Sequence, residues 1–296
     1  MTKDHYWPKA LSKFWMDNEG KVCRLSSEGD LVRGAPAKFG VVGNHHYIDL
    51  EGPWSHSIES SFQAADDRIS FVVDALNSLE AKPSNEEMAY MKRFKAGSFD
   101  SKSKNDFAES IASLIVRSPG FRHKLTLEQK AFRNEFLPDL PFRDSNDLKV
   151  LELRNIQIKY PEMIASLRAS GKIIVMFSDS REFIFGEGFL QDIDGPNPLL
   201  PCKCFVPLTP GMAIAFVRPS GPYFSMPEVV TIQLTPNEVN LCNEITQIYS
   251  RRYIYFRSEQ PVISKEFTDN VYYFLDYSKH PWMDGLLAAA VNFEDN

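Results

Sequence analysis

The stretch GKIIVMFSDSREFIFGEGFL, residues 171–190, decides the fold. It contains two short runs rich in Val, Ile and Phe, separated by a polar turn. Similar runs follow at CFVPL (204–208), MAIAFV (212–217) and VVTIQL (229–234). These runs are split by Gly and Pro clusters and lie too close together for crossover helices. The sequence therefore predicts a mainly antiparallel sheet over residues 172–234.

Upstream of this region the apolar residues change to a helical period. The longest example lies in residues 57–79, where spacings of three and four predict one buried stripe made of Ile58, Phe62, Ala65, Ile69, Val72, Val73, Leu76 and Leu79. A second helix is expected over residues 105–117, with Asn105 as its N-cap and Pro119 just beyond its end. Shorter helices are expected at 85–94, 126–136 and 147–168, the last with a break at Pro161.

Turn-rich segments separate these elements. Residues 19–33 alternate around SSEGD, which predicts a hairpin. Residues 95–105, KAGSFDSKSKN, are polar and predict an exposed loop. A further helix is expected to begin at Pro236 and run toward Arg252, whereas the residues after 257 have mixed signals and support no prediction.

Together these elements predict an α+β fold, in which a helical layer from the N-terminal half packs on a mainly antiparallel sheet from the C-terminal half. No repeat or Pro/Gly-rich linker divides the chain, so residues 1–296 are expected to form a single α+β domain. Residues 50–170 would be rich in helix, residues 171–235 would hold the sheet, and residues 236–296 would form a helix and a tail.

Composition narrows the class of protein. The chain has 296 residues, 43% of them hydrophobic, with a net charge of −6, which suits a globular protein and argues against bulk electrostatic binding to polyanions. Its 4 cysteines lack a paired framework and are expected to be reduced thiols. The start of the chain has no secretory pattern, and no apolar run approaches the roughly 20 residues of a membrane span. We therefore expect a cytoplasmic protein with no membrane contact.

Common catalytic and cofactor motifs are missing from the sequence, which contains no GxxxxGK[ST], GxGxxG after a strand, HExxH or GxSxG pattern. Cys202 and Cys204 have no second pair at zinc spacing, so we interpret them as strand thiols and predict no metal site. Of His45 and His46, at most one can join a given cluster, because neighbours in an extended segment point to opposite faces. The sequence therefore does not indicate which cofactor, if any, the protein uses.

His56 and Glu59 are three residues apart at the start of the long helix. This spacing can place a base beside its orienting carboxylate, or two ligands on one metal. The simpler interpretation is that Glu59 lies in the first turn because the helix dipole favours an acidic residue there.

Fragments in order along the chain resemble a bacterial family known as domain of unknown function 4238. They are HYWPKALSKFW followed by EGKVCRL, HHYIDL, IESSF, IVRSPGFR, REFIFGEGFL, VPLTPGMAIAF and NEVNLCNEITQIYSRRYIY, which together cover most of residues 5–256. The family has no settled biochemistry, but some members occur among antiphage defence genes, so the resemblance implies a defence role. Where the family usually reads TSDNP after a strand, this chain has GEG, so Glu187 replaces an Asp and the following Pro is lost.

The family's polar motif residues fall here on His5, Pro8, Tyr47, Glu59, Arg117, Pro119, Pro207 and Pro210. Glu59 and Arg117 both lie at the border of their apolar helix faces. They could pair across two packed helices, which would lower the pKa of Glu59, or they could line a cleft. We expect the HYWP segment to dock on the helical layer with His5 turned toward these two residues; the alternative is an aromatic plug in which His5 is only structural.

Two hypotheses for function follow. In the first, the protein is a hydrolase for nucleic acid or nucleotides, in which His5 is the general acid or base, Glu59 orients it or binds a metal, Arg117 holds a phosphate and Glu187 is a second carboxylate. The candidate binding residues are Tyr6, Tyr47 and Arg122. In the second hypothesis the protein is a non-catalytic sensor or interaction protein of a defence system, its partner is a phage component, and the same residues form a buried polar network.

Overall fold

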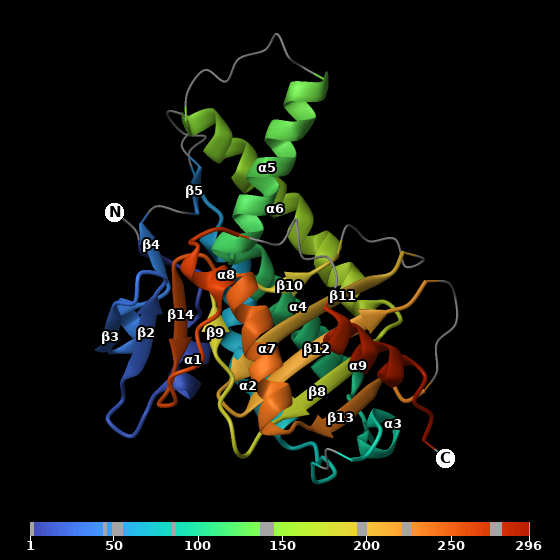
Figure 1. Ribbon diagram of the computed structural model, residues 1–296. Coiled ribbons are helices and arrows are strands. Elements are labelled where there is room, and N and C mark those ends of the chain that lie inside the picture. Colours follow the sequence, from blue (N-terminus) through green and yellow to red (C-terminus); the bar gives the residue numbers. More distant parts are fainter. Residues whose placement is uncertain are drawn as a thin grey trace.

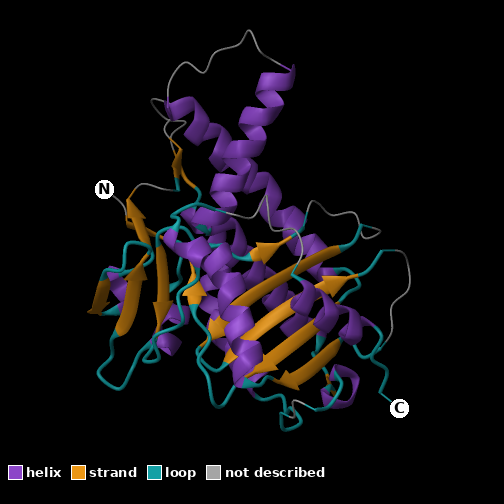
Figure 2. Cartoon of the chain, in the orientation of Figure 1, coloured by secondary structure: helices purple, strands orange, loops and turns teal. Residues whose placement is uncertain are grey.

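The computed structural model describes residues 3–43, 46–48, 56–84, 87–136, 145–193, 200–220, 226–272 and 280–295 (Figure 1). The described chain contains helices together with mainly antiparallel sheets, so the α+β class is confirmed. Strands from both halves of the sequence join the sheets, and helices from both halves lie over them, as the colours of Figure 1 show. Figure 2 distinguishes the helices from the strands in the same view. The structure therefore does not divide into a helical half and a sheet half.

The larger sheet has six strands in the order β10-β11-β12-β8-β13-β7. Their bounds are Leu190–Gln191, Cys202–Thr209, Met212–Arg218, Lys172–Phe177, Val229–Gln233 and Lys95–Gly97. Every neighbouring pair is antiparallel except β8 and β13, which run parallel. The prediction of a mainly antiparallel sheet is confirmed. The predicted loop at 95–105 is wrong, because residues 95–97 pair with β13 at the edge of this sheet.

The second sheet has four antiparallel strands in the order β3-β2-β14-β9. Their bounds are Leu31–Gly34, Val22–Ser26, Tyr253–Phe256 and Phe185–Gly186. Strands β2 and β3 form the predicted hairpin. The strand expected over REFIF is shorter than predicted, because the N–H groups of Glu182 and Ile184 donate to the side chains of Glu259 and Asn243 instead of to a strand.

Two strand pairs lie near the N-terminus. Strand β1 (Lys3–His5) pairs with β4 (Val41–Gly43), and β5 (Tyr47–Ile48) pairs with β6 (His56–Ser57). The short helix α1 (Lys9–Ser12) and the 3₁₀ turn Lys13–Trp15 lie between β1 and β2, and the 3₁₀ turn Pro36–Lys38 lies between β3 and β4.

The long helix predicted from residue 57 is present as a 3₁₀ turn, Glu59–Phe62, followed by α2, Gln63–Asn77. Its predicted stripe is buried from Ile58 to Leu76, with Leu79 partly buried. Figure 1 shows α2 and α4 (Ser101–Arg117) behind the larger sheet, with α7 (Pro236–Ile248) and α9 (Pro281–Val291) in front of it. This explains why Ile173–Met176 of β8 are all buried, since both faces of the sheet are covered.

Several helix ends differ from the prediction. Helix α4 begins at Ser101 because Asp100, not Asn105, is its N-cap and accepts a 2.7 Å hydrogen bond from the Ser103 N–H. After Ser118 the chain starts α5 (Pro119–Phe136) at once, well before residue 126, since proline suits the first helical position. Helix α6 (Ser145–Arg168) continues through Pro161 without the expected break. The remaining helices of the described residues are α3 (Tyr90–Arg93) and α8 (Lys265–Thr268). Helix α3 is shorter than the predicted helix 85–94, because residues 87–89 are not helical.

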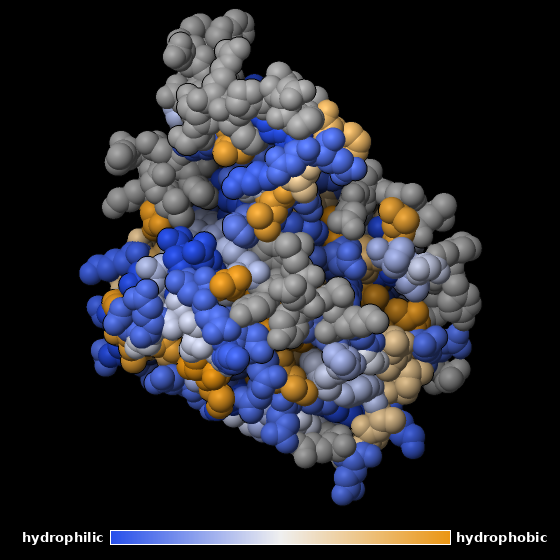
Figure 3. All heavy atoms as spheres, turned by 45° about the horizontal axis from the view of Figure 1, so that its top comes forward, coloured by the Kyte–Doolittle hydropathy of each residue, from blue (hydrophilic) through white to orange (hydrophobic). Residues whose placement is uncertain are grey.

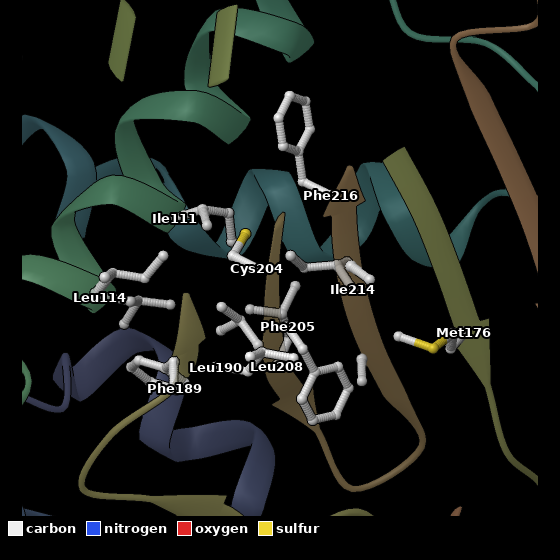
Figure 4. Packing of buried hydrophobic residues seen from close by; sticks show 14 of the residues in the cluster. Ile111, Leu114, Met176, Phe189, Leu190, Cys204, Phe205, Leu208, Ile214 and Phe216 are labelled. Atoms are coloured by element: carbon white, nitrogen blue, oxygen red, sulfur yellow. The ribbon is translucent and has the colours of Figure 1, made fainter. Parts of the chain in front are cut away.

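The main core lies between α4 and the larger sheet. In Figure 4, Ile111 and Leu114 of α4 face side chains of β10 and β11, among them Leu190 and Cys204. Among the helices of the described residues, none is both long and apolar enough to cross a bilayer. Figure 3 shows hydrophobic side chains in separate groups within a hydrophilic surface on the described part of that face.

Candidate functional site

The N-terminal aromatic segment is buried, but its rings pack on strands β9 and β14 of the second sheet and not, as the sequence predicted, on the helical layer. Trp7 is 1% exposed and Tyr6 is 6% exposed, and the Tyr6 hydroxyl shares a 2.7 Å hydrogen bond with the hydroxyl of Tyr255 on β14. Gly40 has a φ of +65°, and a Cβ at this position would lie 2.5 Å from the Trp7 Cβ. The close approach of these two segments therefore requires glycine at position 40.

His5 lies at the end of β1, half-buried, beside the start of α2 and the end of α4. Its backbone carbonyl accepts a 3.3 Å hydrogen bond from Nη1 of Arg117. Burial, then the charges of Lys9 and Arg117, lower the pKa of His5, while Glu59 and Asp66 oppose this. The imidazole is therefore mainly neutral at pH 7.

Glu59 forms a hydrogen-bonded dyad with His46, a residue that the sequence offered only as one of two neighbouring histidines. The bond joins Glu59 Oε2 to His46 Nδ1, and the His46 side chain is 1% exposed whereas that of Glu59 is 36% exposed. When Glu59 is ionised its carboxylate can only accept this bond, and the proton then lies on Nδ1 of His46. His45 and the side chain of His56 lie outside the described residues.

Arg117 is fully buried in the last turn of α4, but its direct partner is Asp66 of α2 rather than Glu59. Nη1 lies 3.0 Å from Asp66 Oδ2, Nη2 bonds to Oδ1, and the guanidinium lies 4.9 Å from the centre of the Phe62 ring. Of the two alternatives that the sequence left open, the direct Glu59–Arg117 pair does not form, because Asp66 occupies the guanidinium. The pKa of Glu59 is raised, because burial outweighs the opposing charges of Arg117, His5 and Arg122.

Arg122 reaches the same region from the first turns of α5. It is 3% exposed, its Nη1 lies 2.8 Å from Glu152 Oε1 on α6, and its charge acts on Glu59. The sharp change of direction at Ser118 brings Arg117 and Arg122 to one place although they belong to different helices. We call the group His5, His46, Glu59, Asp66, Arg117 and Arg122 the His5 cluster.

Glu187 lies apart from this cluster, in the loop between β9 and β10. Its carboxylate is 1% exposed and accepts hydrogen bonds from the N–H groups of Arg252 (2.7 Å) and Tyr253 (3.1 Å). Burial raises its pKa, and these backbone donors oppose that shift. Its charge acts on buried tyrosine hydroxyls, including Tyr6 and Tyr255, so the contacts of Glu187 join segments of the second sheet.

The remaining candidates are placed simply. Tyr47 is half-buried on β5, opposite Ser57 and next to His46. Cys202 and Cys204 are buried on β11. Within the described ranges, no three His, Cys, Asp or Glu side chains are grouped so that they could hold a metal ion.

Sequence reasoning missed Asp66 and did not distinguish His46 from His45. Asp66 lies three residues before Ile69, at the edge of the buried stripe of α2, which is a position that can reach a neighbouring helix. The described geometry brings together one half-buried imidazole, one hydrogen-bonded His–carboxylate pair and two buried guanidinium groups. These groups form a polar cluster within an α+β protein.

The comparison with known proteins identifies the family. Residues 3–260 match the family described as Protein of unknown function (DUF4238), and the chain belongs to that family. No curated protein and no solved structure matches the chain.

Proposed function

We propose that this protein is an antiphage defence hydrolase that cleaves phosphoester bonds in nucleic acid or a nucleotide. The observation that carries the proposal is the position of His5. It is half-buried, and its lowered pKa favours the neutral base. The charges of Glu59 and Arg117 act on it, and Arg122 acts on Glu59. The resemblance to a family with members among defence genes supports the biological role.

In this proposal His5 is the general base that removes a proton from the attacking water. The His46–Glu59 dyad is a second acid–base pair, and the raised pKa of Glu59 suits a group that returns a proton to the leaving oxygen. Arg117 and Arg122 contribute positive potential toward the phosphate. Tyr47, next to His46, serves as a binding residue. Tyr6 is buried and bonded to Tyr255, so in this proposal Tyr6 and Glu187 support the fold around the site.

One observation favours the alternative, a non-catalytic sensor or interaction protein that binds a phage component. Both arginines already have carboxylate partners, Asp66 and Glu152, and Glu187 is enclosed by backbone donors. Such satisfied networks fix the packing of layers without any reaction. In this alternative the His5 cluster binds no phosphate, and substitutions in it change function only by lowering the stability of the protein.

The test compares His5→Ala with His123→Ala. His123 is a matched control because it is also a partly buried histidine whose pKa burial lowers, but it lies on α5 and contacts Tyr272, with ring centroids 5.0 Å apart. Phage plaque formation, protein abundance and hydrolysis of DNA, RNA and nucleotides are measured for both variants. The hydrolase proposal expects only His5→Ala to lose protection and hydrolysis while remaining folded. A stable, abundant and fully protective His5→Ala variant would refute it.

A further inference from the structure

A cleft separate from the His5 cluster lies where the first turns of α5 meet residues 188–192. Its volume is about 210 Å³, which is room for roughly seven water molecules at about 30 Å³ each. Its described lining comes from α5, from the segment around β10, from Lys203 on β11 and from Tyr249 after α7. None of the candidate site residues lines it.

The base of the cleft is built by unusually close backbone packing. A Cβ on Gly188 would lie 2.2 Å from the carbonyl oxygen of Tyr249, and one on Gly120 would lie 3.0 Å from the Gly188 Cα. The Gly120 N–H also donates a 2.9 Å hydrogen bond to the carbonyl of Glu187. The cleft is therefore formed by contacts of the fold itself and needs no rearrangement to exist.

One part of the lining is apolar and aromatic. Phe121 and Phe189 are each 6% exposed and Leu190 is 3% exposed, so their packing holds them in place. Aromatic side chains in such fixed positions suit the flat face of a ring.

The other part of the lining is polar with an excess of positive charge. Among the charged residues of the described lining, Lys124 and Lys203 outnumber Asp192. Lys203 Nζ lies 2.7 Å from Asp284 Oδ1, and this short ion pair fixes the ammonium group at the cleft. The ion pair of Lys124 is longer, with 3.8 Å between Lys124 Nζ and Glu128 Oε1. The hydroxyl of Tyr249 shares a 3.2 Å hydrogen bond with Nε2 of His280 and adds a polar group at the same cleft.

We propose that this cleft binds a small organic anion, a molecule that joins a flat ring to a phosphate or carboxylate group. The ring contacts Phe121 and Phe189, and the anionic group binds at Lys124 and Lys203. A nucleoside monophosphate and an aromatic carboxylate share this chemistry. The site is distinct from the proposed hydrolytic centre, so the two proposals can fail independently.

Isothermal titration of the full chain tests the proposal with three kinds of probe: the four nucleoside 5′-monophosphates, 4-hydroxyphenylacetate and inorganic phosphate. We expect one of the organic probes to bind with a Kd of about 1 mM or lower. Binding of a nucleoside monophosphate or of the aromatic carboxylate identifies which of the two ligand types the cleft accepts. Lys124→Met and Lys203→Met should each weaken that binding about tenfold or more, because a charged hydrogen-bond partner is lost. Lys130→Met, an exposed lysine on the same helix as Lys124, should leave it unchanged.

His5→Ala should also leave binding unchanged, because His5 does not line the cleft. If Lys203→Met does not fold, Lys124→Met decides the result. The proposal is overturned if no organic probe binds, if inorganic phosphate binds as tightly as the organic probes, or if binding survives in the lysine variants.

Discussion

The indole of Trp7 lies nearly parallel to the ring of Phe185, with centroids 4.8 Å apart and planes inclined by 12°. The same indole contacts Tyr255 at 4.7 Å and Trp15 at 6.1 Å between ring centroids. The first residues of the described chain are therefore part of the core and hold the second sheet against the rest of the molecule.

Trp7→Ala should lower the free energy of unfolding by about 3–5 kcal/mol, because it removes a fully buried indole and leaves a cavity. Deleting residues 1–8 should also lower the melting temperature measurably. Denaturant melts measure the first effect, and Lys13→Ala, at an exposed position nearby, should change stability by less than about 0.5 kcal/mol. An unchanged melt for Trp7→Ala would contradict the docked position.

Ile69→Ala should cost about 2–5 kcal/mol, because Ile69 is 1% exposed at the centre of the α2 stripe. Phe71→Ala on the same helix is the matched control, since Phe71 is 70% exposed and its loss should cost less than about 0.5 kcal/mol. Equal costs for the two variants would show that the face of α2 has been assigned wrongly.

Asp66 and Arg117 should be strongly coupled in a double-mutant cycle. Asp66→Ala leaves a buried guanidinium without its carboxylate, which should cost about 3–5 kcal/mol, whereas adding Arg117→Met should recover part of that loss. We expect a coupling energy of roughly 0.5–3 kcal/mol. Asp67→Ala, at an exposed position of α2, serves as the control, and purely additive effects of Asp66 and Arg117 would refute the direct pair.

Stability should rise with pH above neutrality because of Lys172. Its buried ammonium donates a 2.9 Å hydrogen bond to the carbonyl of Phe293, and burial lowers its pKa from 10.5 to about 8. In the window between these values the unfolded chain binds more protons than the folded one, so the free energy of unfolding increases with pH, by roughly 1–2 kcal/mol between pH 8 and 9.5. Lys172→Met should flatten this rise in urea melts; parallel curves for the two proteins would exclude Lys172 as its source.

The proposed base also makes a prediction about pH. Because the pKa of His5 lies below 6.5, the hydrolysis rate should fall only below that pH. Lys9→Met removes a positive charge that lowers this pKa, so both the acid limb of the pH–rate profile and the His5 imidazole titration followed by NMR should move to higher pH. Lys13→Met is the control. If the NMR titration of His5 moves in Lys9→Met but the acid limb of the pH–rate profile does not, the ionisation of His5 does not control the hydrolysis rate.

Patterns of neighbouring residues predicted the helices and strands that are determined by local sequence. The apolar period placed α2 and its stripe, the alternating hairpin placed β2 and β3, and Val/Ile-rich runs placed β8 and β11–β13. Pairing between distant segments has no such signal. The parallel contact of β13 with β8 and the insertion of β14 between β2 and β9 depend on tertiary packing, which the residues of a single strand do not encode.

The candidate site was predictable to the same degree. The motif fragments pointed to His5, Glu59 and Arg117, and Arg122 was a separate binding candidate. Arg117, His5 and Arg122 all act electrostatically on Glu59, whereas Glu187 lies apart and is bonded to the N–H group of Arg252. The partner of Arg117 was not predictable, because Glu59 and Asp66 both lie near the edge of one helix stripe and only the packing of α2 on α4 selects Asp66. Likewise Asp100 and Asn105 are both good caps by residue type, and only the structure shows that Asp100 accepts the bond from the Ser103 N–H.

The place of β14 between β2 and β9 also constrains how a ribosome can deliver this fold. Tyr6 meets its hydrogen-bond partner Tyr255 only after 249 further positions of chain, and at about 5–20 residues per second that interval lasts roughly 12–50 s. During synthesis the β2–β3 hairpin and the aromatic rings of the first residues have no completed sheet to join. The nascent chain must therefore keep this apolar N-terminal surface from aggregating, alone or with a chaperone, until its last third has left the exit tunnel.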